Sequence, residues 1–165
     1  MEYFCHAASM ARQETIVTPS SRIQWLSDLI RLEIALWNQI NTRLHQEHDL
    51  SLAFFESLYF IGHSRDGRLR VGDLARALRI TVGATSKLVD RIEAAGLLRR
   101  ELDADDRRAS RLVLTDAGKR KLADASTTYE AEMATVLDAT LSTDEQQRLH
   151  DLVTRLLAAT NDGEP

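Results

Sequence analysis

Cysteine, proline and long apolar runs are all scarce in this chain of 165 residues. The single cysteine, Cys5, excludes an intrachain disulfide framework and fits a reducing cytoplasm. No apolar run reaches the roughly 18–20 residues that span a bilayer, so no membrane contact is expected. The opening MEYFCHAASMARQET lacks a cationic start followed by an apolar block, which argues against a secretory signal. We therefore expect a cytoplasmic protein.

The residue patterns of common catalytic and metal sites are also missing. No Ser-His-Asp, Cys-His or phosphate-loop arrangement is visible, so we expect neither an enzyme nor a cofactor. His45 and His48 lie three residues apart, but without a convincing third ligand they do not predict a metal site. Only two prolines occur, Pro19 and Pro165, so long uninterrupted helices are permitted between them.

What the chain does have is an uneven distribution of charge. Its net charge is −4, yet residues 65–111 carry twelve Lys or Arg against eight Asp or Glu, a net of +4. The remainder therefore carries −8. A basic middle between acidic ends is typical of a polyanion-binding module on a non-binding frame.

Apolar residues recur at three- and four-residue steps in both flanks of the chain. The first stripe predicts a helix from about Ser20 or Ser21, the candidate N-caps, to residue 48. A second helix is expected over 51–63, and a last one follows the capping-box spacing of Ser142 and Glu145. The first stripe outruns its own domain, which favours packing on a partner chain. The two flanking stripes are Ile23, Leu26, Ile30, Ile34, Trp37, Ile40 and Leu44, and Leu149, Leu152, Val153, Leu156 and Leu157.

The middle of the chain predicts a helix-turn-helix followed by a β-hairpin. A short helix over 73–80 stops at Thr81, a good N-cap for a helix over 82–96 that Gly96 ends. The expected inward residues of this second helix are Thr85, Leu88, Ile92 and Ala95. Two strands, LLRREL (97–102) and SRLVL (110–114), then flank the polar turn DADDRRA, and LRV (69–71) could add an edge strand. Thr115 caps the helix that follows. The fold class is mainly α with a small β-wing, a winged helix-turn-helix.

Three stretches, DLARALRIT (73–81), KLVDRIEAAGLLRR (87–100) and DADDRRASRLVLTDAG (103–118), resemble the MarR family of bacterial transcription regulators. The last looks like the family's wing signature, an Asp-Arg-Arg tip leading to a Leu-Thr-x-x-Gly helix start. The resemblance covers about residues 20–160 and implies a dimer interlocked by the first and last helices. It implies the following division: a flexible arm (1–19), a helical dimerisation region (20–48 and 116–160), a DNA-binding lobe (50–115) and a tail (161–165).

The resemblance places the helix over 82–96 in the major groove of DNA, where N-terminal residues meet base edges. Its candidate DNA-binding residues are Thr81, Val82, Gly83, Ser86, Lys87 and Arg91. Lys87 can reach guanine or a phosphate, Val82 a thymine methyl, and Gly83 would let the backbone come close. Thr81 and Arg91 fit phosphate contacts. The helix start, VGAT, departs from the more polar run usual in the family, and solvated helix charges are the alternative interpretation of Lys87 and Arg91.

At the wing, the resemblance makes Arg108 the arginine that enters the minor groove and Asp106 the acid that braces it. Arg107 and Arg111 would lie nearer phosphates or the wing base. The alternative is a plain turn with weak local ion pairs.

The function implied is a homodimeric, sequence-specific DNA-binding regulator, most often a repressor, on a pseudo-palindromic operator in double-stranded DNA. In relatives a small, often aromatic or phenolic, effector binds beside the lobe, and Trp37, Phe55 and Tyr59 are the candidate pocket residues here. Two alternatives stay open. One is a winged-helix protein-interaction module, and the other is a redox switch at Cys5, although Arg12 is the only Lys or Arg near that thiol.

Overall fold

The structure, a computed structural model, describes residues 19–103 and 110–161. The chain divides into two compact units, residues 1–35 and 36–165. The described ranges contain six helices and three strands, which confirms the mainly α fold with a small sheet. In chain order they are α1 (Pro19–His48), α2 (Leu52–Gly62), β1 (Arg68–Arg70), α3 (Val71–Leu78), α4 (Val82–Ala94), β2 (Leu98–Leu102), β3 (Ser110–Leu114), α5 (Asp116–Leu137) and α6 (Thr143–Asn161).

In the first unit, the described residues belong to the start of α1. This helix begins at Pro19, so Ser20 and Ser21 lie inside it and are not its caps. Proline is favoured in a first turn, because the N–H that it lacks would have no helical partner there. The apolar stripe of this segment is exposed, from Ile23 at 73% to Ile34 at 51%. No described residue buries this part of the stripe.

In the second unit, the end of α1 lies against α5. Ile40 and Leu44 are buried, unlike the earlier members of the stripe. Glu132 of α5 accepts hydrogen bonds from Gln39 Nε2 (3.0 Å) and Arg43 Nε (2.6 Å). These two bonds hold the pKa of the Glu132 carboxyl below its usual value. The pair of helices is therefore joined by apolar burial and by a charged contact.

Helices α3 and α4 form the helix-turn-helix. Arg79 ends α3 in the left-handed conformation (φ 53°), and Ile80 N donates to Ala75 O (3.2 Å) across the turn. Thr81 caps α4 as predicted, since its hydroxyl accepts from Ala84 N (3.2 Å). Gly96 (φ 74°) ends the helix in the left-handed conformation, as its position predicted. The turn and both ends of α4 are thus fixed by local hydrogen bonds.

The prediction that Ala95 belongs to the inward face of α4 is wrong. Thr85 and Ile92 are buried and Leu88 is half-buried, but Ala95 is exposed and Val89 is fully buried instead. A step of 3.6 residues from Thr85 and Ile92 leads to Val89, and α4 ends before Ala95 can continue the face.

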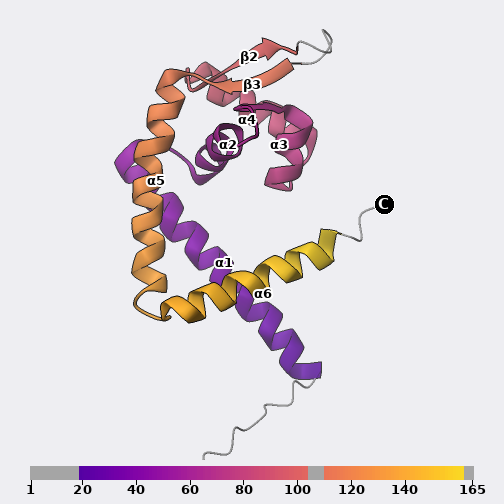
Figure 1. The fold of residues 1–165 in the computed structure, drawn as a ribbon, viewed down its shortest axis with the longest axis vertical. Helices are drawn as coiled ribbons and strands as arrows, with labels where there is room; N and C mark the ends of the chain where they lie inside the picture. Colours follow the sequence, from indigo (N-terminus) through magenta and orange to yellow (C-terminus); the bar gives the residue numbers. More distant parts are fainter. Residues whose placement is uncertain (1–18, 104–109, 162–165) are drawn as a thin grey trace, which may run out of the picture. The chain divides into compact units, whose positions relative to one another are not determined.

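The three strands form an antiparallel sheet in the order β1-β3-β2, so β1 is the expected edge strand. In the hairpin, Leu98 pairs with Leu114 and Leu102 with Ser110. Figure 1 shows the hairpin at the N-terminal end of α5, with α2, α3 and α4 gathered beside it. Leu98, Leu112 and Leu114 join the buried cluster that α2, α4 and α5 share. The core therefore lies directly behind the two faces that the resemblance assigns to DNA.

The start of α5 is joined tightly to the end of α4. Thr115 caps α5 by accepting from Gly118 N (3.0 Å), and its hydroxyl donates to Gly96 O (2.7 Å). Thr115 N also donates to Leu97 O (3.1 Å). Gly118 packs so closely here that a Cβ would lie 1.9 Å from Leu97 O. We call the contact between 96–97 and 115–118 the α4–α5 junction.

Helix α6 exposes its apolar stripe. Ser142 N donates to the Glu145 carboxylate (2.9 Å), which is the expected capping-box contact. The stripe of α6 from Leu149 to Leu157 is 40–53% exposed. Like the start of α1, this face is left uncovered by the described residues of its own unit.

Candidate nucleic-acid interface

The N-terminal turn of α4 presents an open surface. Thr81, Val82 and Gly83 are all exposed, and Val82 is 56% exposed although it is apolar. No described atom outside the local backbone lies within 4 Å of where a Gly83 Cβ would be. The first N–H groups of a helix carry a partial positive charge. This turn therefore offers backbone donors, a hydroxyl and a small apolar group to a partner outside the chain.

The next turns of α4 add two cations. Lys87 is exposed, and no hydrogen bond or ion pair joins it to a described residue. Arg91 is exposed too, but its guanidinium lies over the Phe54 ring, 5.2 Å from the centroid. Ser86 is half-buried, and its hydroxyl donates to Val82 O (2.9 Å). The Lys87 ammonium group is thus held by no described residue, whereas the Arg91 guanidinium is held over the Phe54 ring. The Ser86 hydroxyl already donates its proton to Val82 O.

The wing begins with a buried ionic cluster that the sequence did not reveal. Asp103 is 3% exposed and accepts from Arg70 Nε (3.0 Å) and Nη2 (2.6 Å) and from Arg111 Nε (2.9 Å). Arg111 therefore lies at the wing base, one of the two positions left open for it. The cluster joins β1, the end of β2 and β3 where the loop begins. Asp106, Arg107 and Arg108 lie outside the described residues, as does Cys5.

Other basic residues of the lobe are neutralised by neighbours. Arg100 Nη2 contacts Asp90 (2.6 Å) and its Nη1 contacts Glu93. Arg99 contacts Glu101 (2.6 Å). These pairs consume much of the positive charge of residues 65–111. On α4, Lys87 and Arg91 are exposed and form no ion pair with a described carboxylate.

Two of the three candidate effector residues line one cavity. Phe55 and Tyr59 of α2 border a cavity of about 270 Å³ with Ser126 and Tyr129 of α5. Trp37, 40% exposed, is not among its lining residues. Burial raises the pKa of Tyr129 first, and the negative charge of Glu56 raises it further.

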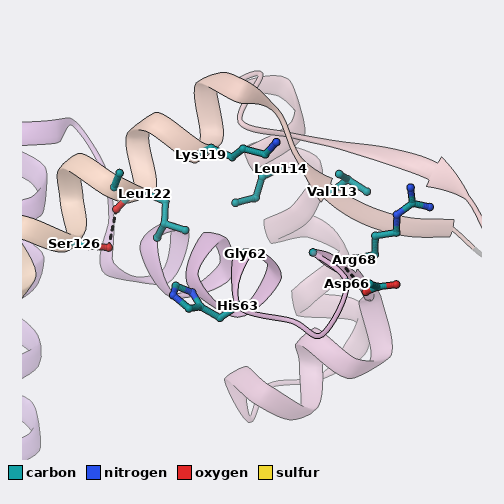
Figure 2. Close-up of a pocket in the computed structure, with 11 residues that line it drawn as sticks. Gly62, His63, Asp66, Arg68, Val113, Leu114, Lys119, Leu122 and Ser126 are labelled. Atoms are coloured by element: carbon teal, nitrogen blue, oxygen red, sulfur yellow. Dashed lines mark hydrogen bonds between the residues drawn. The ribbon is translucent and has the colours of Figure 1, made fainter.

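A larger cavity of about 580 Å³ lies where α2 ends, between β3 and the start of α5 (Figure 2). Leu114 and Leu122 point toward Gly62 at its inner side, and a Cβ on Gly62 would be 2.9 Å from Leu122 Cδ2. Arg68, Lys119, His63 and Asp66 provide its polar lining. The two cavities share Ser126.

The described residues contain neither a candidate metal site nor a candidate membrane-spanning helix. Within 19–103 and 110–161, no three or more His, Cys, Asp or Glu side chains are grouped so that they could hold a metal ion. His48 Nε2 instead lies 2.8 Å from Thr128 Oγ1. Across the same ranges, no helix has both the length and the apolar character that a bilayer crossing requires.

Comparison with known proteins gives matches over the lobe and over most of the chain. A model of the MarR family matches residues 48–109. The uncharacterized HTH-type transcriptional regulator YcgE of Bacillus subtilis (strain 168) is 30% identical over 105 residues, or 59% of this chain and 67% of that protein.

Solved structures share the fold. AbsC, a MarR family transcriptional regulator from Streptomyces coelicolor, is 26% identical with a TM-score of 0.77, over 89% of this chain and 97% of that chain. The S. aureus MepR-DNA complex contains a chain that is 28% identical with a TM-score of 0.66, over 84% of this chain and 97% of that one. The winged helix and these matches agree: the chain belongs to the MarR family, whose members are transcription regulators and not enzymes.

Proposed function

We propose that this MarR-family protein is a homodimeric regulator, acting as a repressor, that binds a pseudo-palindromic operator in double-stranded DNA. Its half-sites lie about one helical turn apart, and α4 enters the major groove. The observation that carries the proposal is the open N-terminal turn of α4, with Lys87 beside it paired with no described residue. The MepR structure, which is a DNA complex, supports it. The protein then acts in the cytoplasm, where bacterial DNA lies.

Each residue of the interface has a separate task in this proposal. Val82 contacts a thymine methyl, Lys87 lies between a base edge and the neighbouring phosphate, and Thr81 and Arg91 contact phosphates. Ser86 contributes through its lone pairs, because its proton is directed to Val82 O. Arg108 enters the minor groove with Asp106 as its brace, and Arg107 contacts phosphate. Arg111, bound to Asp103, positions the wing base.

The uncovered stripes of α1 and α6 support the dimer. Leucine, isoleucine and tryptophan side chains that are 37–73% exposed in one chain are unfavourable in water and are removed from it by a second copy. A small aromatic effector bound near Phe55 and Tyr59 would relieve DNA binding, with Trp37 as a third candidate contact.

Selection of bound DNA from a random pool tests the proposal, with the mass of the protein in solution measured in parallel. We expect an enriched inverted repeat and a dimer. A winged helix used only for protein interaction would give no enriched sequence, and a monomer that binds a single half-site would contradict the dimer. An unchanged peroxide response in Cys5→Ser would remove the redox alternative.

Operator affinity should fall steeply with salt, because phosphate contacts release counterions. Replacing Lys87 by glutamine should reduce the magnitude of the slope of log K against log salt by roughly 1–2, one contact per half-site. Fluorescence anisotropy with labelled operator at four salt concentrations measures it. Arg120→Gln, which removes an equal charge from the exposed side of α5, is the control. An unaltered slope in Lys87→Gln would mean that this lysine contacts no phosphate.

Gly83→Ala should stabilise the protein and yet weaken operator binding. Alanine is favoured over glycine in a helix by up to about 1 kcal/mol, and the space around Gly83 is open. The same methyl group would stand between the α4 backbone and DNA, so we expect operator affinity to fall about tenfold. Chemical denaturation and anisotropy measure the two effects. A stabilised variant with full operator affinity would show that the close approach does not occur.

A further inference from the structure

The cavity between α2 and α5 has walls made largely of aromatic rings. Phe55 and Tyr129 are stacked, with centroids 5.1 Å apart and an interplanar angle of 15°. Tyr59 lies 6.3 Å from Phe55 and meets Phe60 edge to face at 5.8 Å. All four rings line the cavity. The cluster therefore surrounds the space with π-faces and π-edges, not with aliphatic groups.

The remaining lining consists of one serine, Ser126, and two acidic residues. Glu56 and Glu130 border the cavity, and no Lys, Arg or His does. In the part of the chain that the structure describes, neither carboxylate takes part in an ion pair or a hydrogen bond. Glu56 is half-buried, and this burial raises the pKa of its carboxyl. An unpaired carboxylate that has lost part of its hydration gains most from a cation nearby.

Aromatic faces and carboxylates both favour a ligand that carries a positive charge. The face of an aromatic ring is negative and attracts ammonium groups, and aromatic cages are how proteins recognise quaternary ammonium compounds. An anionic phenol or benzoate would instead meet two carboxylates of its own sign. The neighbouring cavity in Figure 2 differs, because Arg68 and Lys119 border it against the single acid Asp66.

We infer that the cavity between α2 and α5 binds a small organic cation, an amine or quaternary ammonium carrying an apolar group. Binding of the cation does not depend on the proposed function. Only its role as the effector that relieves DNA binding rests on the proposed function. The occupant carries a charge opposite to that of an ionised phenol, one form of the phenolic effectors that the family resemblance implies. A cavity of about 270 Å³ suits a ligand smaller than most drugs.

Benzyltrimethylammonium, benzyl alcohol and benzoate form a suitable series of probes, because they share a ring and differ in charge. Isothermal titration of the full chain should give one site per chain for the cation. Its affinity should exceed that of the neutral and anionic probes by about tenfold or more. Equal affinities, or a preference for benzoate, would overturn the inference.

Variants locate the site. Glu56→Gln should lower the affinity for the cation by about tenfold, while Asp124→Asn on the exposed side of α5 should leave it unchanged. Tyr59→Leu keeps an apolar group but removes a ring, and it should weaken the cation and spare benzyl alcohol. Circular dichroism and a thermal melt show whether each variant is folded. If Glu56→Gln and Asp124→Asn fold and bind the cation equally, the assigned cavity is wrong.

Operator binding separates this inference from the proposed function. At a cation concentration near the wild-type Kd, the affinity of the wild type for its operator should fall clearly more than that of Glu56→Gln. A chain that binds the cation at this site and has no DNA preference would refute the proposed function and leave the site standing. A chain that binds its operator but not the cation would refute the inference alone.

Discussion

Arg108→Ala should weaken operator binding by about 1–3 kcal/mol, a roughly 5- to 150-fold rise in Kd, while the dimer stays intact. A guanidinium in a narrow minor groove lies where the negative potential of DNA is strongest, and alanine removes both the charge and the fit. Residue 108 lies outside the described residues, but the strands on either side of its loop are anchored. Leu102 pairs with Ser110, and Asp103 binds Arg111. The substitution should therefore leave the fold unchanged. Anisotropy on operator DNA and sedimentation measure the two properties.

The neighbouring arginine provides the matched control. Arg107→Ala removes the same charge one residue away, and it should weaken operator and random DNA by similar, smaller factors, as loss of a phosphate contact does. Arg108→Lys should recover the charge but only part of the affinity, because lysine lacks the planar fork of arginine. Equal losses in Arg107→Ala and Arg108→Ala, or no loss in the latter, would rule out the assigned minor-groove role.

Gly118→Ala should lower the free energy of unfolding by about 2–4 kcal/mol. The new Cβ would lie 1.9 Å from Leu97 O and 2.9 Å from Leu97 C, and both are backbone atoms that no side-chain rotation can move aside. Leu97 O also accepts from Thr115 N, so relieving the clash strains that bond too. Urea denaturation at equal protein concentration measures the effect.

Gly72→Ala is the control for this substitution. Gly72 lies in α3, and no atom outside its local backbone is within 4 Å of its Cβ position. Alanine there should be neutral or stabilising, because the helix preference acts without a clash. Comparable stability of both variants would mean that the α4–α5 junction opens at little cost.

The parts of the fold that local chemistry specifies could be predicted from the sequence. Thr81 and Thr115 each precede an amphipathic stretch and cap it through their hydroxyl groups. Gly96 ends α4 because glycine accepts the left-handed conformation easily. Each of these signals lies within four residues of its partner, so a linear pattern contains the whole interaction.

Interactions between distant residues could not be predicted in the same way. The cluster of Arg70, Asp103 and Arg111 depends on the strand order β1-β3-β2 and its register. In the sequence, the available signal was Asp103, an acid directly after one predicted strand, with Arg111 in the next strand. Without the register of the strands, this signal does not show which arginines Asp103 contacts. The acidic lining of the α2–α5 cavity is similar, since Glu56 and Glu130 lie on different helices.

The α4–α5 junction also determines how a displacement travels through the lobe. The hydrogen bond from Thr115 N to Leu97 O and the close approach of Gly118 to Leu97 O join backbone to backbone, so side-chain movement alone absorbs little of a shift of α5. We therefore expect a displacement of the start of α5 to carry the end of α4 with it. Both cavities border α5, and the 13 residues of α4 extend about 20 Å from the junction to Val82. A small tilt of α5 at the cavities is then expected to move the turn at Val82 by a larger distance.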